Sequence, residues 1–81
     1  MAESSMDVFI ATLDRVVYEG KAKSVIAPGE AGVFEVLPYH KKLLSRLMPG
    51  TLWIDGQSFP IRRGVIKVGP MEVTAVVEEA R

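Results

Sequence analysis

The chain has 81 residues, and its ten basic and ten acidic side chains cancel to a formal net charge of zero. This length predicts a single domain, residues 1–81, that buries roughly 60% of the surface of its unfolded chain. The zero net charge argues against broad binding to a phosphate backbone, and the lack of cysteine excludes disulfides and thiolate metal sites. The polar start lacks a signal-peptide segment, so we expect a soluble intracellular domain that depends on a dense apolar core.

Turn-forming residues recur along the whole chain, which leaves room for short strands and almost none for helices. The segments between the turns are rich in β-branched residues, in chain order 8–10, 16–18, 25–26, 65–68 and 73–77. Over 72–78, apolar and polar side chains alternate, which is typical of an antiparallel strand with one buried face. We predict an all-β fold, a small β-sandwich of about eight to ten short strands.

The segment VFEVLPYHKKLLSRLMPG, residues 33–50, is the one place where a short helix could form. Apolar side chains recur there with the spacing of one helical face, at Leu43, Leu44, Leu47 and Met48. A proline near each end limits any helix to one or two turns near residues 41–47. So short a helix is unstable alone, so we expect Leu43 or Leu44 to be buried against the sandwich.

The Asp55-Gly56 pair lies between the segments TLWI and QSFPIR and is the best hairpin signal in the chain. Asp-Gly readily adopts the two positive φ values of a type I′ turn. Pro60 has no N–H to donate to a neighbouring strand. Its strand is therefore expected to lie at a sheet edge or to contain a bulge.

No group of residues has the spacing of a catalytic, cofactor or metal site. His40 is the only histidine, and no cysteine accompanies it to complete a metal site. Glu30 and Glu35 flank a turn, with no sign of the contrasting environments that a catalytic carboxylate pair needs. The segment GEAG, residues 29–32, lacks the lysine and hydroxyl residue of a phosphate loop. We therefore expect no catalytic, cofactor-binding or metal-binding residues.

The basic residues Lys41, Lys42 and Arg46 leave a binding role open. With Tyr39 and Trp53 as stacking platforms, they would suit a free-standing OB-like module for single-stranded nucleic acid. The alternative is that most of the aromatic side chains fill the core. On these patterns alone, the chain is a β-sandwich that acts as a binding or assembly module.

Four segments match one family pattern in order: ATLDRVVYEG (11–20), VIAPGEAG (25–32), GVFEVLPYHKKLLSRLMPG (32–50) and RGVIKVGPMEVTAVV (63–77). The third is similar to the signature G-x-F-G-V-L-P-G-H-A-P-L-L-T-x-L-x-P-G, with departures at Glu35, Tyr39, Lys41 and Lys42. A collinear match over nearly the whole chain is far more specific than a single motif. On these residues the chain resembles the N-terminal domain of the epsilon subunit of F-type ATP synthases, a β-sandwich of about ten strands.

The resemblance implies a non-catalytic rotor subunit of the central stalk, which bridges the gamma subunit and the c-ring and couples ion flow to ATP synthesis. It implies a gamma-facing surface that includes Thr12, His40, Leu43 and Ser45. It also implies a loop that faces the c-ring, made of Gly29, Glu30, Ala31, Gly32 and Val33.

The same resemblance implies where the protein lies and what it does not bind. It places the chain peripherally at the cytoplasmic face of the bacterial cell membrane, within the ATP synthase complex and without direct membrane insertion. It implies no cofactor and no nucleic acid. We expect a monomer in isolation. The two C-terminal helices that carry the family's inhibitory function have no counterpart among these 81 residues.

Overall fold

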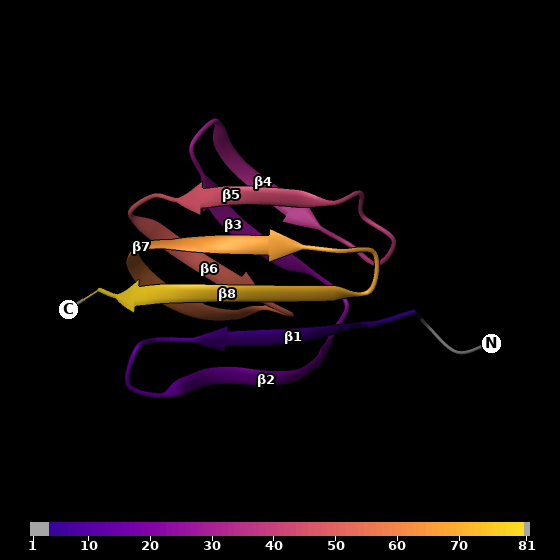
Figure 1. Ribbon diagram of the computed structural model, residues 1–81, viewed down its shortest axis with the longest axis horizontal. Helices are drawn as coiled ribbons and strands as arrows, with labels where there is room; N and C mark the ends of the chain where they lie inside the picture. The colour runs from indigo at the N-terminus through magenta and orange to yellow at the C-terminus, as the bar shows by residue number, and fades with distance from the viewer. Residues whose placement is uncertain (1–3, 81) are drawn as a thin grey trace.

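The computed structural model describes residues 4–80, which form eight strands and no helix. The strands are β1 (Met6–Ala11), β2 (Val16–Ala22), β3 (Val25–Gly29), β4 (Gly32–Val36), β5 (Leu43–Leu47), β6 (Gly50–Ile54), β7 (Gln57–Val68) and β8 (Glu72–Glu79). In Figure 1, β2, β1, β8, β7 and β5 form the nearer layer, with β6, β3 and β4 behind. The predicted all-β sandwich is confirmed. Within residues 4–80 there is no helix that could cross a membrane.

Strand β7 joins the two layers. Its second half pairs antiparallel with β5 and β8, and its first half pairs with β6. The register against β8 shifts between Ile61 and Arg63, which marks a bulge where the strand passes from one layer to the other. Strand β6 also pairs with β3, and β3 meets β5 at Gly29 and Leu47. Hydrogen bonding is therefore continuous from one layer to the other.

The predicted Asp55-Gly56 hairpin connects β6 and β7. Both residues have positive φ, 47° and 85°, and their neighbours pair directly across the turn. The Asp55 carboxylate accepts hydrogen bonds from the backbone N–H groups of Lys23 and Ser24, at 2.9 and 3.0 Å. These bonds tie the hairpin tip to the corner between β2 and β3. Pro60 lies outside the paired register of β8 and next to the bulge, as its missing N–H predicted.

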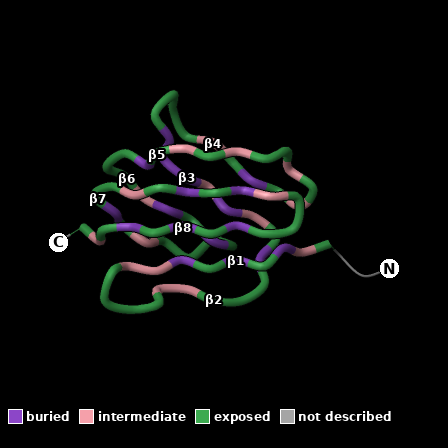
Figure 2. Tube along the Cα trace, in the orientation of Figure 1, coloured by how far each residue is buried: buried purple, intermediate pink, exposed green. Residues whose placement is uncertain are grey.

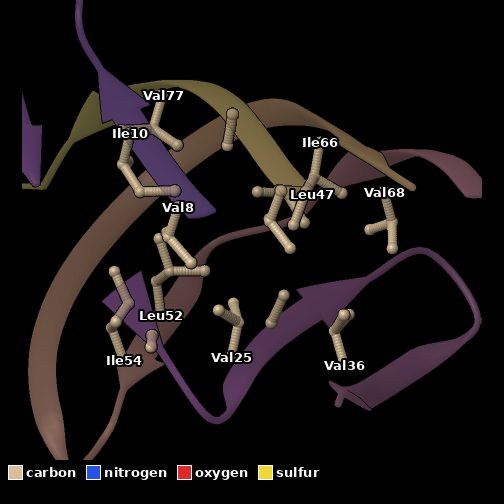
Figure 3. Close-up of a cluster of buried hydrophobic side chains, with 14 of the residues drawn as sticks. Val8, Ile10, Val25, Val36, Leu47, Leu52, Ile54, Ile66, Val68 and Val77 are labelled. Carbon is tan, nitrogen blue, oxygen red and sulfur yellow. The ribbon is translucent and has the colours of Figure 1, made fainter. Parts of the chain in front are cut away.

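The core lies between the layers, and every strand contributes at least one buried apolar residue to it. Figure 2 marks where the buried residues fall along the chain. In β8 the predicted alternation is confirmed, with Val73, Ala75 and Val77 buried. Figure 3 shows side chains of the nearer layer meeting those of the layer behind, with Val8 close to Leu52. Among the described residues no polar or charged side chain is buried. The core is therefore purely apolar.

The segment near residues 41–47, where at most one or two helical turns were possible, contains none, because Leu43–Leu47 forms β5 and pairs with β7. An isolated turn of helix gains little, whereas pairing with β7 satisfies the backbone along the whole segment. Strand geometry turns Leu43 and Leu47 inward and Leu44 outward. Leu43 is half-buried against the core, Leu44 is 72% exposed and Leu47 is 2% exposed. The residue that anchors the segment is therefore Leu47.

We predict that Leu47→Ala lowers the free energy of unfolding by about 2–5 kcal/mol, because it leaves a cavity in the apolar core. The matched control on the same strand is Leu44→Ala, whose side chain is already in water. It should change the free energy by less than about 0.5 kcal/mol. Urea denaturation of both variants measures the difference. Equal losses would contradict the outward position of Leu44.

A second prediction concerns Gly29, which pairs with Gly32 across the β3–β4 hairpin. A Cβ atom at Gly29 would lie 2.7 Å from the ring of Phe34 and 3.1 Å from the carbonyl oxygen of Gly32. Gly29→Ala should therefore lower the free energy of unfolding by about 1–3 kcal/mol, as overpacking does. Ala31→Ser at the exposed tip serves as the control. An unchanged thermal midpoint of Gly29→Ala would show that Phe34 moves away freely.

Candidate protein-docking surfaces

Thr12 lies in the turn between β1 and β2, where its side chain holds the turn together. Its hydroxyl oxygen accepts hydrogen bonds from the backbone N–H groups of Asp14 and Arg15, at 3.0 and 3.1 Å. The Arg15 guanidinium donates to both oxygens of the Glu79 carboxylate, at 2.9 and 2.7 Å, and so fastens the turn to β8. Leu13 at the tip is 96% exposed. Thr12 therefore stabilises the turn, and Leu13 is the residue of the turn that is most exposed to solvent.

His40 lies in the loop between β4 and β5. Figure 1 shows this loop at the opposite end of the nearer layer from the β1–β2 turn, which contains Thr12. Its Nδ1 atom is 2.7 Å from the carbonyl oxygen of Lys41, and its backbone N–H donates to the carbonyl of Leu37 at 3.1 Å. Across residues 4–80, no group of three or more histidine and acidic side chains could hold a metal ion. The contacts of His40 are thus local to its loop.

Leu43 and Ser45 lie in β5 on its inner side. Their cross-strand partners are Val68 and Ile66, both buried. The Ser45 hydroxyl donates to the carbonyl oxygen of Arg46, at 2.8 Å. The side chains of β5 that face outward are instead Leu44 and Arg46. The sequence analysis named Leu44 as a possible anchor and Arg46 as part of a basic patch, but it did not place them on one outward face. In a strand, the period of two puts them on the side opposite Leu43 and Ser45.

The five residues predicted to face the c-ring lie together on the β3–β4 hairpin, whose tip projects at the top of Figure 1. Gly29 is buried at its base, while the other four are exposed, Val33 by 74%. Gly32 has a φ of 126°, a value that side chains disfavour, and it closes the tight turn. This hairpin is separate from the β1–β2 turn and from the β4–β5 loop.

The outward side of β5, β7 and β8 carries an apolar band that the sequence prediction did not single out. We call this surface the outer face; its residues are Leu44, Arg46, Val65, Lys67 and Val76. Arg46, Val65 and Val76 form one cross-strand row, and Leu44 lies beside Lys67 in the next. Leu44, Val65 and Val76 are 72%, 49% and 48% exposed. An exposed apolar band rimmed by charge marks an interaction surface. The alternation in 65–68 and 73–77 was the signal for it.

The charge on the outer face is positive, although the chain is neutral. Arg46 and Lys67 form no ion pair with any residue that the structure describes, whereas Arg62 and Arg63 share Glu78 at 3.4 and 3.5 Å. A depression of about 630 Å³ lies between Arg46 and Val76 at the edge of this face. An apolar partner surface that carries carboxylates would complement the outer face.

The nucleic-acid alternative required basic and aromatic side chains on one surface. Trp53 lies in β6, in the layer behind, whereas Arg46 lies on the outer face of the nearer layer. Tyr39 lies in the β4–β5 loop with Lys41 and Lys42. The two stacking platforms are therefore not assembled around one basic patch.

Comparison with known proteins identifies the family. The family model described as "ATP synthase, Delta/Epsilon chain, beta-sandwich domain" matches residues 5–81. The ATP synthase epsilon chain of a Nitratiruptor species is 43% identical over 76 residues, which cover 88% of this chain and 59% of that protein. The ATP synthase epsilon chain of Bordetella parapertussis is 33% identical, with 95% of this chain and 59% of that protein covered. The chain thus spans less than two thirds of the length of these relatives.

Solved structures share the fold at low sequence identity. A chain in the Euglena gracilis mitochondrial ATP synthase OSCP/F1/c-ring structure superposes with a TM-score of 0.86 at 18% identity, over 100% of this chain and 55% of that one. A chain in the Tetrahymena thermophila central stalk/c-ring structure gives 0.78 at 15% identity, over 98% of this chain and 67% of that one. The family match and the epsilon-chain relatives confirm the resemblance found in the sequence: the chain belongs to the β-sandwich domain family of ATP synthase delta and epsilon chains.

Proposed function

We propose that this chain is a non-catalytic central-stalk subunit of an F-type ATP synthase, which bridges the gamma subunit and the c-ring. The observation that carries the proposal is the outer face, an exposed apolar and cationic band on a member of this family. Epsilon-chain relatives at 43% and 33% identity support it. In this role the chain lies peripherally at the cytoplasmic face of the bacterial cell membrane, within the complex, and other subunits perform catalysis.

The gamma subunit is proposed to cover the outer face. Thr12 and His40 border this layer at its two ends, and Leu43 and Ser45 support β5 from the inner side. These four predicted residues would then shape the interface, while the outward side chains, Val76 among them, make the direct contact. A stable complex of this kind buries roughly 1,200–2,000 Å² in total, which a sheet face together with both bordering turns can supply.

The c-ring is proposed to meet the tip of the β3–β4 hairpin, where Val33 is exposed. A bridging subunit needs two separate surfaces on one stiff body, and the base of this hairpin is braced. The backbone N–H of Met48 donates to the carbonyl of Pro28 at 2.8 Å, and Gly50 packs against the Pro28 ring. Close-packed interiors transmit strain, so torque at one surface reaches the other through the core.

A substitution on the outer face tests the gamma contact. Val76→Asp should weaken binding to F1 particles depleted of their own epsilon chain by about tenfold or more, because the contact would desolvate an unpaired carboxylate. Calorimetric titration gives the affinity, and thermal melting verifies that the variant folds.

The matched control for this experiment is Trp53→Asp. Trp53 is 42% exposed and lies in a strand of the opposite layer, so its replacement should leave the affinity for F1 unchanged. If Trp53→Asp abolishes binding and Val76→Asp does not, gamma binds the other layer.

A further inference from the structure

Tyr39 has an unfavourable backbone conformation. Its φ is 69°, in the left-handed region, and among residues 4–80 the only other non-glycine residue with positive φ is Asp55. Asp55 forms a hairpin turn whose side chain bonds two backbone N–H groups. Aspartate tolerates the left-handed region, whereas a bulky aromatic residue is an outlier there. The conformation of Tyr39 therefore costs folding free energy. The intrinsic backbone preference of tyrosine does not explain why the residue adopts it.

The Tyr39 side chain forms no polar or aromatic interaction within the described chain that would offset this cost. The residue is 69% exposed, and neither its hydroxyl nor its ring forms a hydrogen bond or an aromatic pair with any of residues 4–80. What holds the residue is its backbone. Its N–H donates to the carbonyl oxygen of Pro70 in the β7–β8 turn, and the next N–H, of His40, donates to Leu37. The fold thus fixes an exposed aromatic ring on a braced loop.

The other residues of the loop that contains Tyr39 are apolar or basic, and Glu72, beyond Met71 in the neighbouring turn, forms no ion pair with them. Leu37 is 50% exposed in the same loop, and Met71, adjacent to Pro70, is 39% exposed. Lys41 and Lys42 follow Tyr39 closely, and neither forms an ion pair with a residue in the described part of the chain. The loop from 37 to 42 contains no acidic residue. This patch therefore presents an aromatic side chain flanked by two unpaired positive charges.

We propose that Tyr39 is an anchor residue for a protein partner: its ring enters an apolar pocket whose rim carries carboxylates that pair with Lys41 and Lys42. This inference rests on the proposed function and commits to the gamma subunit as the occupant. Tyrosines that are held in a fixed position on the free protein and become buried on binding often contribute most of the binding energy of an interface. Two lysines in a chain without net charge are too few for the basic cluster that an anionic lipid surface attracts.

The test is Tyr39→Gly, which removes the ring and relieves the positive φ at the same position. We expect the thermal midpoint of the free chain to rise by a few degrees. The affinity for F1 depleted of its epsilon chain should fall by about tenfold or more. If Tyr39 had only a structural role, its loss would lower both the thermal midpoint and the affinity for F1. The control Tyr39→Phe keeps the ring and the strain, so it should keep both the midpoint and most of the affinity.

The flanking charges are tested by the double variant Lys41→Glu, Lys42→Glu. If carboxylates of gamma face these lysines, charge reversal should slow association and remove most of its salt dependence. The isolated domain should still fold, because both side chains are exposed. If the double variant associates as fast as the wild type, carboxylates of gamma do not face these two lysines.

The outcomes separate this inference from the proposed function. If the wild-type chain does not bind depleted F1, the proposed function fails, and the inference, which commits to gamma, fails with it. If the wild type binds and Tyr39→Gly binds as tightly, only the anchor inference is overturned. The anchor inference would also be overturned if the wild type binds phosphatidylserine vesicles or a single-stranded oligonucleotide and Tyr39→Gly does not. Either result would assign the loop to a different class of partner.

Discussion

The structure depends on one strand that belongs to both layers. Strand β7 pairs with β6 at its start and with β5 and β8 at its end, and a bulge between Ile61 and Arg63 allows the change. Directly after this bulge, a Cβ atom at Gly64 would lie 2.6 Å from the carbonyl oxygen of Val76, so a side chain there would push β8 away. Gly64 thus lets β7 and β8 approach closely where β7 leaves the bulge. The register of β7 against β5, β6 and β8 determines which side chains of these strands face the core and which face solvent.

That closure separates apolar side chains inside from polar side chains outside. The space between the layers is filled by aliphatic side chains, with no buried polar group in the part of the chain that the structure describes. The polar and charged residues lie on the surface or in turns. The two surfaces proposed above as binding sites, the outer face and the β4–β5 loop, are built from outward residues.

The sequence predicted features governed by local chemistry and missed those set by strand pairing. Alternation identified the buried face of β8, and the positive φ preference of Asp-Gly located the β6–β7 hairpin. The spacing alone left the conformation of residues 43–48 open, because two adjacent pairs of apolar residues fit a helix as well as a strand. Only pairing with β7 decides between these, and it makes Leu44 a surface residue. Similarly, nothing in the spacing of Thr12 and His40 shows that they lie at opposite ends of one layer.

The two proposed docking surfaces are mechanically linked through the backbone. The outer face reaches the β3–β4 hairpin by way of β5, whose Leu47 pairs with Gly29 at the base of the hairpin. The next residue, Met48, donates its N–H to Pro28, so two consecutive backbone positions fasten β5 to β3. Leu47 is also buried in the core, so the link cannot slide without opening the sandwich. A force applied to the outward side chains of β5 is therefore carried to the hairpin tip by hydrogen bonds and packing rather than by a flexible connection, as a subunit that couples two partners requires.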